Sequence, residues 1–570
     1  MKNSKNRYVS LVVFSAVALS ISHGLYADTL TTMKEELDRA FEALQSQEVP
    51  PYFISYEITE DVTASVSGGF GEVTSESSGV TRFLDIDLRV GDYSLDNTRP
   101  RQGGGFNFSF EPPTPISVGN DEALKATLWY RTDAKYKAAL TQFTNVQSDV
   151  QSTVEADDKS GDFSNAPASE YSMDRVELVA DTSEWSEKLR QYTRPFAEAE
   201  FIQDNSASIN GDVETRWFVN TDGSKIRVSR PFYRMIIQAT TKADDGMVLN
   251  LVKTFEANSP EKLLDDEKVL LAVNSMINNL EALRVAPLVE PYTGPAILSG
   301  RASGVFFHEI LGHRLEGHRQ KGADEGQTFR KKIGQKVLPE TFSVVFDPNI
   351  PTYGDIELSG TYMYDNEGVR GQRVVAIENG VLKGFLMSRS PIEGYPESNG
   401  HGRKNYGNSV VARQSNLIVE VKDAYSPEEL EAMLLERVKE QGTEFGLYFD
   451  DITGGFTMTG RTMPNAFNVT PVMVYRLYPD GTKELVRGVD LIGTPLTTFS
   501  RIEAGATDFQ VFNGMCGAES GWVPVSAVSP SILVTQIEVQ KADSSRDIPP
   551  ILPSPVSRPG DQSIRYVGEH

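Results

Sequence analysis

Three histidines and a glutamate lie close together in the segment SGVFFHEILGHRLEGHRQ, and these residue types bind and use metal ions. His308, His313 and His318 fall within eleven residues, although the whole chain has only six histidines. Glu309 stands directly beside the first of them. Imidazole is a common zinc ligand, and a carboxylate next to the ion can accept a proton from water during hydrolysis. The segment is therefore a candidate zinc site of a hydrolase.

The spacing of the first two histidines differs from that of the common zinc-binding helix. In the pattern H-E-x-x-H the two histidines are four residues apart and share one helix face. His308 and His313 are five residues apart, which turns the second ring by about 140° on a regular helix. Both rings can reach one ion only if the helix widens or ends between them, and Gly312 permits either change. A surface histidine pair is the alternative that spacing leaves open.

A third ligand must come from elsewhere in the chain, because catalytic zinc commonly has three protein ligands and one open position. The remaining candidates are His318, His401 and Cys516. Cys516 is the only cysteine, and a thiolate bound to zinc is deprotonated and shielded. A lone cysteine is more often buried and inert. Spacing alone does not decide between Cys516 and His318.

Beyond these residues, the segment HEILGHRLEG resembles the metal-binding motif HExxGHxLEG of the TldD/PmbA family of zinc proteases. The resemblance is dense from about residue 285 to 540 and thin before residue 210. It continues, in the order of the family, through GQKVLPETFSVVFDPN (334–349), YDNEGVRGQRVVAIENGVLKGFLMS (364–388), SNGHGRKNYGNSVVARQSN (398–416), ITGGFTMTG (452–460), LVRGVDLIGTP (485–495) and NGMCGAESGWVPVSAVSPSILV (513–534).

In that family the two motif histidines and the cysteine of the late MCG segment are the metal ligands, and the motif glutamate is catalytic. The resemblance therefore implies that His308, His313 and Cys516 hold one Zn²⁺ per chain, with Glu309 as general base of peptide-bond hydrolysis. His318 stands where many members have an acidic residue, which argues against an obligatory ligand role. Because every ligand is kept, the resemblance implies an active subunit, in a homodimer or in a heterodimer with a family paralogue.

The amino terminus has the pattern of an export signal. Lys2, Lys5 and Arg7 precede an apolar stretch (8–22), and small residues then lead to Ala27. We expect cleavage near Ala27 and a periplasmic or secreted protein with no stable membrane span after signal removal. A membrane anchor is the alternative, but the apolar stretch is shorter than the roughly 20 residues of a spanning helix. Many family members lack such a signal, so the partners of cytoplasmic members do not transfer directly.

The composition is that of a soluble globular chain, with 39% hydrophobic and 24% charged residues. Its formal net charge is −24, and loss of residues 1–27 removes three positive charges and brings it to −27. Such a surface repels phosphate backbones, so nucleic acid is not an expected partner.

The hydrophobic patterns predict an α+β fold, in which an N-terminal α/β region with antiparallel strands precedes a large, strand-rich C-terminal metallopeptidase domain. Apolar residues at helical spacing predict a helix from Leu30 to Leu44, and alternation predicts strands at 52–58, 81–90 and within 214–256. Asp222-Gly223 signals a turn inside the last of these segments. Helices are also predicted from Ser259 to about Leu283 and from Ser426 to Gly442. The expected organisation is a signal peptide (1–27), an N-terminal α+β domain (28–210) with an acidic linker near 146–176, a central strand and helix region (211–286), the metallopeptidase domain (287–540) and a Pro-rich tail (541–570).

Three functions are compatible with these residues. The first is a zinc-dependent peptidase that acts on short or unfolded peptides, which a sheet edge could hold by main-chain pairing. His401, Arg403 and Tyr406 are candidates for stabilising its oxyanion. The second is a non-catalytic envelope protein whose structural zinc has His318 as fourth ligand. The third is a metal-independent binding module in which Cys516 is simply buried.

Overall fold

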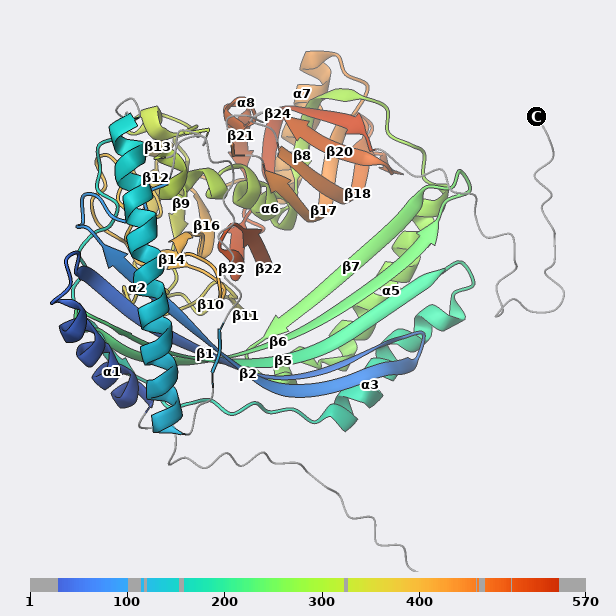
Figure 1. Ribbon diagram of the computed structural model, residues 1–570. Coiled ribbons are helices and arrows are strands. Elements are labelled where there is room, and N and C mark those ends of the chain that lie inside the picture. The colour runs from blue at the N-terminus through green and yellow to red at the C-terminus, as the bar shows by residue number, and fades with distance from the viewer. Residues whose placement is uncertain are drawn as a thin grey trace, which may run out of the picture.

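The computed structural model describes residues 29–100, 114–116, 120–152, 158–321, 326–457, 459–460, 467–493 and 495–542. The expected signal peptide and the Pro-rich tail beyond residue 542 lie outside the described residues. The architecture is α+β, as the sequence predicted (Figure 1). Among the described residues, no helix combines the length and the apolar character needed to cross a membrane.

One long, curved sheet forms the base of the N-terminal half (Figure 1). Its strand order is β3-β2-β1-β5-β6-β4, and β7 also pairs with β6. Neighbouring strands are antiparallel except β4, which runs parallel to β6. The strands are β1 (Pro51–Gly69), β2 (Glu72–Val90), β3 (Thr114–Pro115), β4 (Glu170–Ser172), β5 (Asp204–Asn220), β6 (Lys225–Lys242) and β7 (Val248–Ala257).

Helices cover one face of this sheet, because alternating residues along much of its strands are apolar and need a partner. Along β1, Ile54 and Tyr56 pack with Met33 of α1, and Val66 packs with Trp185 of α3. The opposite face of β1 carries Glu57, which contacts the C-terminal half. The helices are α1 (Thr29–Leu44), α2 (Asp121–Ser152), α3 (Thr182–Glu198), α4 (Pro260–Leu263) and α5 (Asp266–Val285).

Several local predictions are confirmed. The first helix occupies 29–44 as expected, and 52–58 and 81–90 lie in the paired antiparallel strands β1 and β2. The Asp222-Gly223 dipeptide turns the chain between β5 and β6, with Gly223 at a φ of 98° that favours glycine. The helix expected to begin at Ser259 is present but is divided, since Asp265 accepts a hydrogen bond from Lys268 N and starts α5 as a second helix.

Two expected boundaries fall inside regular structure. The prediction of a loop across 146–176 is wrong at its start, because α2 continues to Ser152 and buries Val146. Farther along the same segment Phe163 is also buried, so it is not a purely solvated linker. The division expected at 210/211 lies within β5, which pairs with both β1 and β6 on either side of that point.

Two further sheets form the C-terminal half. One has the order β13-β12-β9-β16-β23-β22, and the other has the order β17-β8-β24-β20-β18-β19 with β21 on β24. Two short strand pairs, β10–β11 and β14–β15, lie beside them. The strands are β8 (Tyr292–Leu298), β9 (Phe342–Phe346), β10 (Thr352–Tyr353), β11 (Ile356–Glu357), β12 (Val374–Glu378), β13 (Val381–Leu382), β14 (Gly402–Arg403), β15 (Val411–Ala412), β16 (Asn416–Val421), β17 (Gly446–Thr457), β18 (Phe467–Leu477), β19 (Lys483–Val486), β20 (Val489–Gly493), β21 (Ile502–Gly505), β22 (Gln510–Ala518), β23 (Gly521–Ser529) and β24 (Ile532–Lys541).

The helices of this half are α6 (Gly300–Ile310), α7 (Pro427–Gln441) and α8 (Pro495–Phe499), with short 3₁₀ turns η1 (Gly312–Leu315), η2 (Gly317–Gln320) and η3 (Arg330–Lys332). Helix α6 lies between the two sheets and packs on β17 and on β22–β23 (Figure 1). The N-terminal sheet closes against this half through buried polar contacts. Arg216 Nη2 donates to Tyr364 O at 2.7 Å, and Lys404 Nζ lies 3.1 Å from Glu57 Oε1.

Candidate metal centre

Helix α6 positions the first histidine and is buried on all sides. Ser299 caps its first turn by accepting a hydrogen bond from Ala302 N at 3.3 Å. Phe306, Phe307 and Ile310 are fully buried between the two C-terminal sheets. A helix that is apolar on every face belongs in a core, and this one carries His308 and Glu309 into the interior near its end.

The helix ends between the two histidines, which confirms the predicted irregularity. The α-helical turns of α6 stop at Ile310, and the 3₁₀ turn η1 carries His313. Gly312 is needed here for close approach rather than for an unusual φ. A Cβ at this position would overlap the side-chain amide of Gln414. That amide donates from Nε2 to His308 O at 3.2 Å, so Gln414 fixes the last turn of the helix.

The structure brings His308, His313 and Cys516 together, although Cys516 comes from the distant strand β22. One donor atom from each of the three lies within 4.8 Å of the others, and all three side chains are buried. Cys516 Sγ is 3.4 Å from His313 Nε2. The two imidazole centroids are 5.0 Å apart at an interplanar angle of 72°.

These distances fit the proposed zinc site. Ligands at normal zinc bond lengths and tetrahedral angles are separated by roughly 3.3 to 3.6 Å, which matches the Cys516–His313 distance of 3.4 Å. The Nδ1 atom of His308 is buried and has no hydrogen-bond partner among the described residues. Buried polar atoms normally have partners, so an unpaired imidazole nitrogen beside a thiol suits a metal ligand.

Charges around the cluster favour the ligand form of the cysteine. Burial would raise the pKa of the Cys516 thiol, but the nearby His313, Arg413 and His308 outweigh burial and hold that pKa well below its usual range. Burial also lowers the pKa of the His313 ring, whereas Cys516 and the Glu316 carboxylate raise it well above the usual range. These directions favour the thiolate form of Cys516. The thiolate is the form that binds metal.

A buried carboxylate that the sequence reasoning did not single out supports His313 from behind. Glu316 Oε1 lies 3.2 Å from His313 Nδ1, and Glu316 Oε2 accepts from Arg319 Nε at 2.8 Å. Arg413 Nε lies 3.6 Å from Glu316 Oε1, and its Nη2 donates to Cys516 O at 2.6 Å. A signal was available, because residues three apart eclipse in a 3₁₀ turn and the LEG segment places a glutamate three residues after His313.

Glu309 lies at the edge of the three-donor cluster and is not one of its members. Its Oε2 atom is 3.9 Å from His313 Nε2, and the residue is 9% exposed. Arg314 donates to the carbonyl oxygens of Glu309 and Ile310 at 3.3 and 3.1 Å. Its guanidinium also interacts favourably with the Glu309 carboxylate.

The other sequence candidates lie outside the cluster. His318 Nε2 pairs with Glu519 Oε1 at 2.5 Å. Both ring nitrogens of His401 have partners within 3.2 Å, and burial lowers its pKa to about 3, so it is a neutral core histidine. Arg403 lies 4.7 Å from the Tyr362 ring centroid, and Tyr406 stacks on Phe83 at 4.5 Å.

The fold and this cluster define the class of protein. Residues 291–541 match the family model of the PmbA/TldA metallopeptidase C-terminal domain, so the strand-rich half is a domain of metallopeptidase type. Residues 291–541 are therefore a domain of the TldD/PmbA family.

Individual relatives agree with this assignment. The chain is 28% identical over 327 residues to a metalloprotease of Methanocaldococcus jannaschii, a match that covers 57% of this chain and 67% of the relative. It is 29% identical over 273 residues to a zinc metalloprotease TldD homologue of Saccharolobus solfataricus, covering 47% and 57%. The crystal structure of TldE from Thermococcus kodakarensis superposes with a TM-score of 0.57 over 89% of this chain and 100% of that chain. Its sequence identity is 14%, so this likeness bears on the fold alone.

Proposed function

We propose that the chain is a zinc-dependent peptidase that hydrolyses peptide bonds in short or unfolded peptides. The observation that carries the proposal is the convergence of His308, His313 and Cys516 on one buried point with Glu309 beside them. Three donors and a neighbouring carboxylate are the usual equipment of a catalytic zinc site. The names of the metalloprotease relatives support the same reading.

Each residue of the centre has a distinct role in this proposal. His308, His313 and Cys516 would hold the ion, and the ion would supply the Lewis acidity that amide hydrolysis needs. Glu309 accepts the proton of the attacking water and returns it to the leaving amine. The Glu316 carboxylate holds the His313 ring by accepting a hydrogen bond from its Nδ1 atom. The other ring nitrogen, Nε2, then points to Cys516.

The position of Cys516 also favours an extended substrate. Strand β22 is at the edge of its sheet among the described strands, and it pairs on one side with β23. A peptide that added itself to the other side of β22 would pass directly along the strand that carries Cys516. Main-chain pairing of this kind needs an unfolded segment and depends little on side chains.

The decisive test is the variant Glu309→Gln, which keeps the size of the side chain but cannot accept a proton. We expect cleavage of a mixed peptide library to fall by ~10²–10⁴-fold, with zinc stoichiometry and thermal unfolding nearly unchanged. The three quantities should be measured side by side on the wild type and the variant. Undiminished cleavage by the variant would refute the role of Glu309.

The alternative is a non-catalytic envelope protein with a structural zinc ion, for which four protein ligands would be typical. The geometry favours the catalytic reading, because His318 is held by Glu519 and stands outside the three-donor cluster. A wild type that binds zinc with full stoichiometry but cleaves no peptide of the library would favour the structural alternative.

We also propose that the protein is exported and that it associates with itself or with a family paralogue. The first point rests on the amino-terminal residues 1–27, and the second on the resemblance to the family. Sequencing of the amino terminus of the mature protein and measurement of its mass in solution test the two points separately. An intact Met1 or a monomeric mass would contradict the respective proposal.

A further inference from the structure

Strand β22, the last of its sheet among the described strands, presents alternate backbone groups to its open edge. The neighbouring strand shows which ones. Ser526 of β23 donates its backbone N–H to Ser415 O, so its backbone faces β16. Because this direction alternates along a strand, Trp522 and Pro524, which has no N–H to donate, also face away from β22. Gly517, the partner of Trp522 in the ladder, therefore directs its N–H and C=O toward the open edge.

The indole of Trp522 lies over Gly517. The two residues share the face of the hairpin opposite to the paired Cys516 and Val523. A Cβ at Gly517 would lie only 3.0 to 3.1 Å from three atoms of the six-membered ring of the indole. The backbone at Gly517 is not in the left-handed region, so glycine is needed here for this close contact. The ring therefore covers β22 at a residue whose backbone faces the edge.

The upper surface of this indole is open. Trp522 is 61% exposed, and its neighbours on the same face, Met515 and Pro524, are half-buried. A single exposed tryptophan is ordinary on a protein surface, but this one is paired with the residue next to a proposed metal ligand. Met515, Trp522 and Pro524 together form an apolar shelf beside the metal centre.

We propose that Trp522 selects substrates with a large apolar side chain, aromatic or aliphatic, at the residue that pairs opposite Gly517. The inference rests on the proposed peptidase function and on pairing at β22, and it adds the chemistry of one substrate residue. Residues directly opposite in a ladder place their side chains on the same face, so this side chain meets the indole. Because Gly517 adjoins Cys516, the selected residue is within about two positions of the bond at the metal centre.

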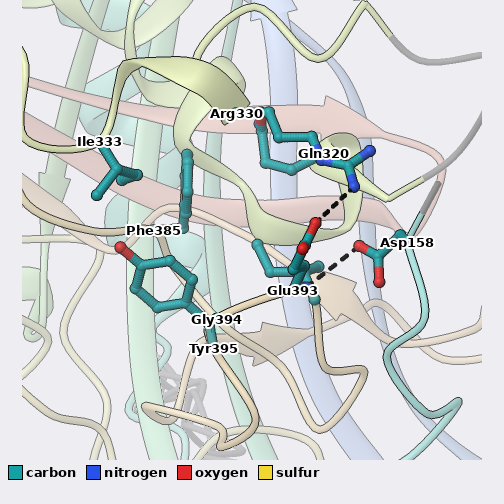
Figure 2. Close-up of a pocket in the computed structure, with 9 residues that line it drawn as sticks. Asp158, Gln320, Arg330, Ile333, Phe385, Glu393, Gly394 and Tyr395 are labelled. Atoms are coloured by element: carbon teal, nitrogen blue, oxygen red, sulfur yellow. Dashed lines mark hydrogen bonds and ion pairs between the residues drawn. The ribbon is translucent and has the colours of Figure 1, made fainter.

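Another apolar surface of the chain could also take such a side chain. A cavity of about 320 Å³ opens beside η2, and Ile333, Phe385 and Tyr395 are part of its wall (Figure 2). None of the described residues that line it belongs to β22 or β23. A peptide paired with β22 would therefore meet the apolar shelf first, and variants on the two surfaces distinguish them.

The binding test uses the zinc-loaded full chain with Glu309→Gln, so that peptides are held but not cleaved. Serine nonapeptides with phenylalanine, leucine, arginine or serine at the central position are titrated by calorimetry. We expect the phenylalanine and leucine peptides to bind about tenfold more tightly than the serine peptide, because the indole covers their side chains. The arginine peptide should resemble the serine peptide. Equal binding of all four, or tightest binding of the arginine peptide, would overturn the proposal.

Variants in the same background locate the preference. Trp522→Thr keeps a strand-forming residue and should bring the four peptides within about threefold of one another. Gly517→Ala should weaken the preference as well, because its Cβ displaces the indole, and it decides if Trp522→Thr does not fold. The controls are Trp129→Thr, an indole that is 57% exposed on α2, and Ile333→Thr in the cavity. Both should keep the preference; its loss in either control, or its survival in Trp522→Thr, refutes the assignment.

Cleavage separates this inference from the proposed function. The zinc-loaded wild type should cleave the phenylalanine and leucine peptides with about tenfold higher kcat/KM than the serine peptide, and Trp522→Thr should remove that difference. A binding preference without any cleavage would reject the peptidase function and retain the apolar shelf. Cleavage of all peptides at one rate would reject the role of Trp522 and retain the peptidase.

Discussion

Substitution of Glu316 by glutamine should weaken zinc binding without removing any proposed ligand. Glu316 is fully buried and contacts the His313 ring at Nδ1, 3.2 Å away, on the side opposite Cys516. The carboxylate fixes the ring orientation and makes the other nitrogen a better donor to the ion. Glutamine keeps the shape and one acceptor oxygen but loses the charge, so the substitution isolates the electrostatic contribution.

The expected magnitude follows from the contacts of Glu316. Groups that orient a metal ligand typically contribute 10- to 100-fold in metal affinity. Because Glu316 also pairs with Arg319 and Arg413 away from solvent, we expect a loss near 100-fold, or about 2.7 kcal/mol. Stability of the metal-free protein should also fall, by about 3 kcal/mol, the low end for a broken buried ion pair. The low end applies because both arginines keep other acceptors.

Zinc affinity is measured by competition with a chromophoric chelator at neutral pH, and stability by denaturant unfolding of the metal-free protein. The matched control is Glu519→Gln, since Glu519 also pairs with Arg319, at 2.9 Å, but its histidine partner is His318 rather than His313. The control should change zinc affinity little. Wild-type affinity in a folded Glu316→Gln protein refutes the argument, and equal losses in both variants show that contact with His313 is not the cause.

Alanine at any one of the three proposed ligands should abolish stoichiometric zinc binding in metal analysis, whereas His318→Ala should retain it. Loss of zinc from the His318→Ala protein would show that the ligand set is different. Gly312→Ala should destabilise the protein by about 1–3 kcal/mol in denaturant unfolding, because the new Cβ overlaps the buried Gln414 amide. The control is Gly454→Ala, which has open space at the Cβ position and should change the free energy of unfolding little. Burial and a neighbouring carboxylate raise the pKa of Glu367 to about 8, so the folded state holds a proton that the unfolded state releases above about pH 4.5. The free energy of unfolding should therefore fall as pH rises between these values, by up to about 1.4 kcal/mol per pH unit, and Glu367→Gln should flatten that slope; an unchanged slope contradicts the assignment.

Local signals predicted the parts of the fold that short segments determine. Helix α7 begins at Ser426 with a capping box closed by Glu429, and it ends at Gly442 with a φ of 66°, as its sequence indicated. The Asp222-Gly223 turn is of the same kind. In each case the residues that decide the conformation are adjacent in the chain, so the pattern contains the information.

Long-range contacts were the part that periodicity could not supply. Position 312 requires glycine because a Cβ there would overlap Gln414, about a hundred residues away in the chain. Cys516 reaches His313 only because α6 packs on β22. Local residue spacing contains no information on either contact. The choice of Cys516 over His318 as third ligand therefore depends on the family resemblance. The prediction of a loop at the start of 146–176 is wrong for a related reason, since Val146 becomes buried only when α2 packs against the rest of the fold.

The same long-range contacts tie formation of the metal centre to assembly of the C-terminal half. Arg413, fully buried, bonds Cys516 O and Ser520 Oγ on the β22–β23 hairpin and lies beside Glu316, which follows η1. It therefore connects the two segments that supply the proposed ligands. A thiolate, a carboxylate and this guanidinium are costly to bury singly but compensate one another when both segments are in place. An isolated α6 or an isolated hairpin would carry only part of this set, so the three donors can converge only in the folded domain. An ion bound there, as proposed, would stabilise the fold as a whole.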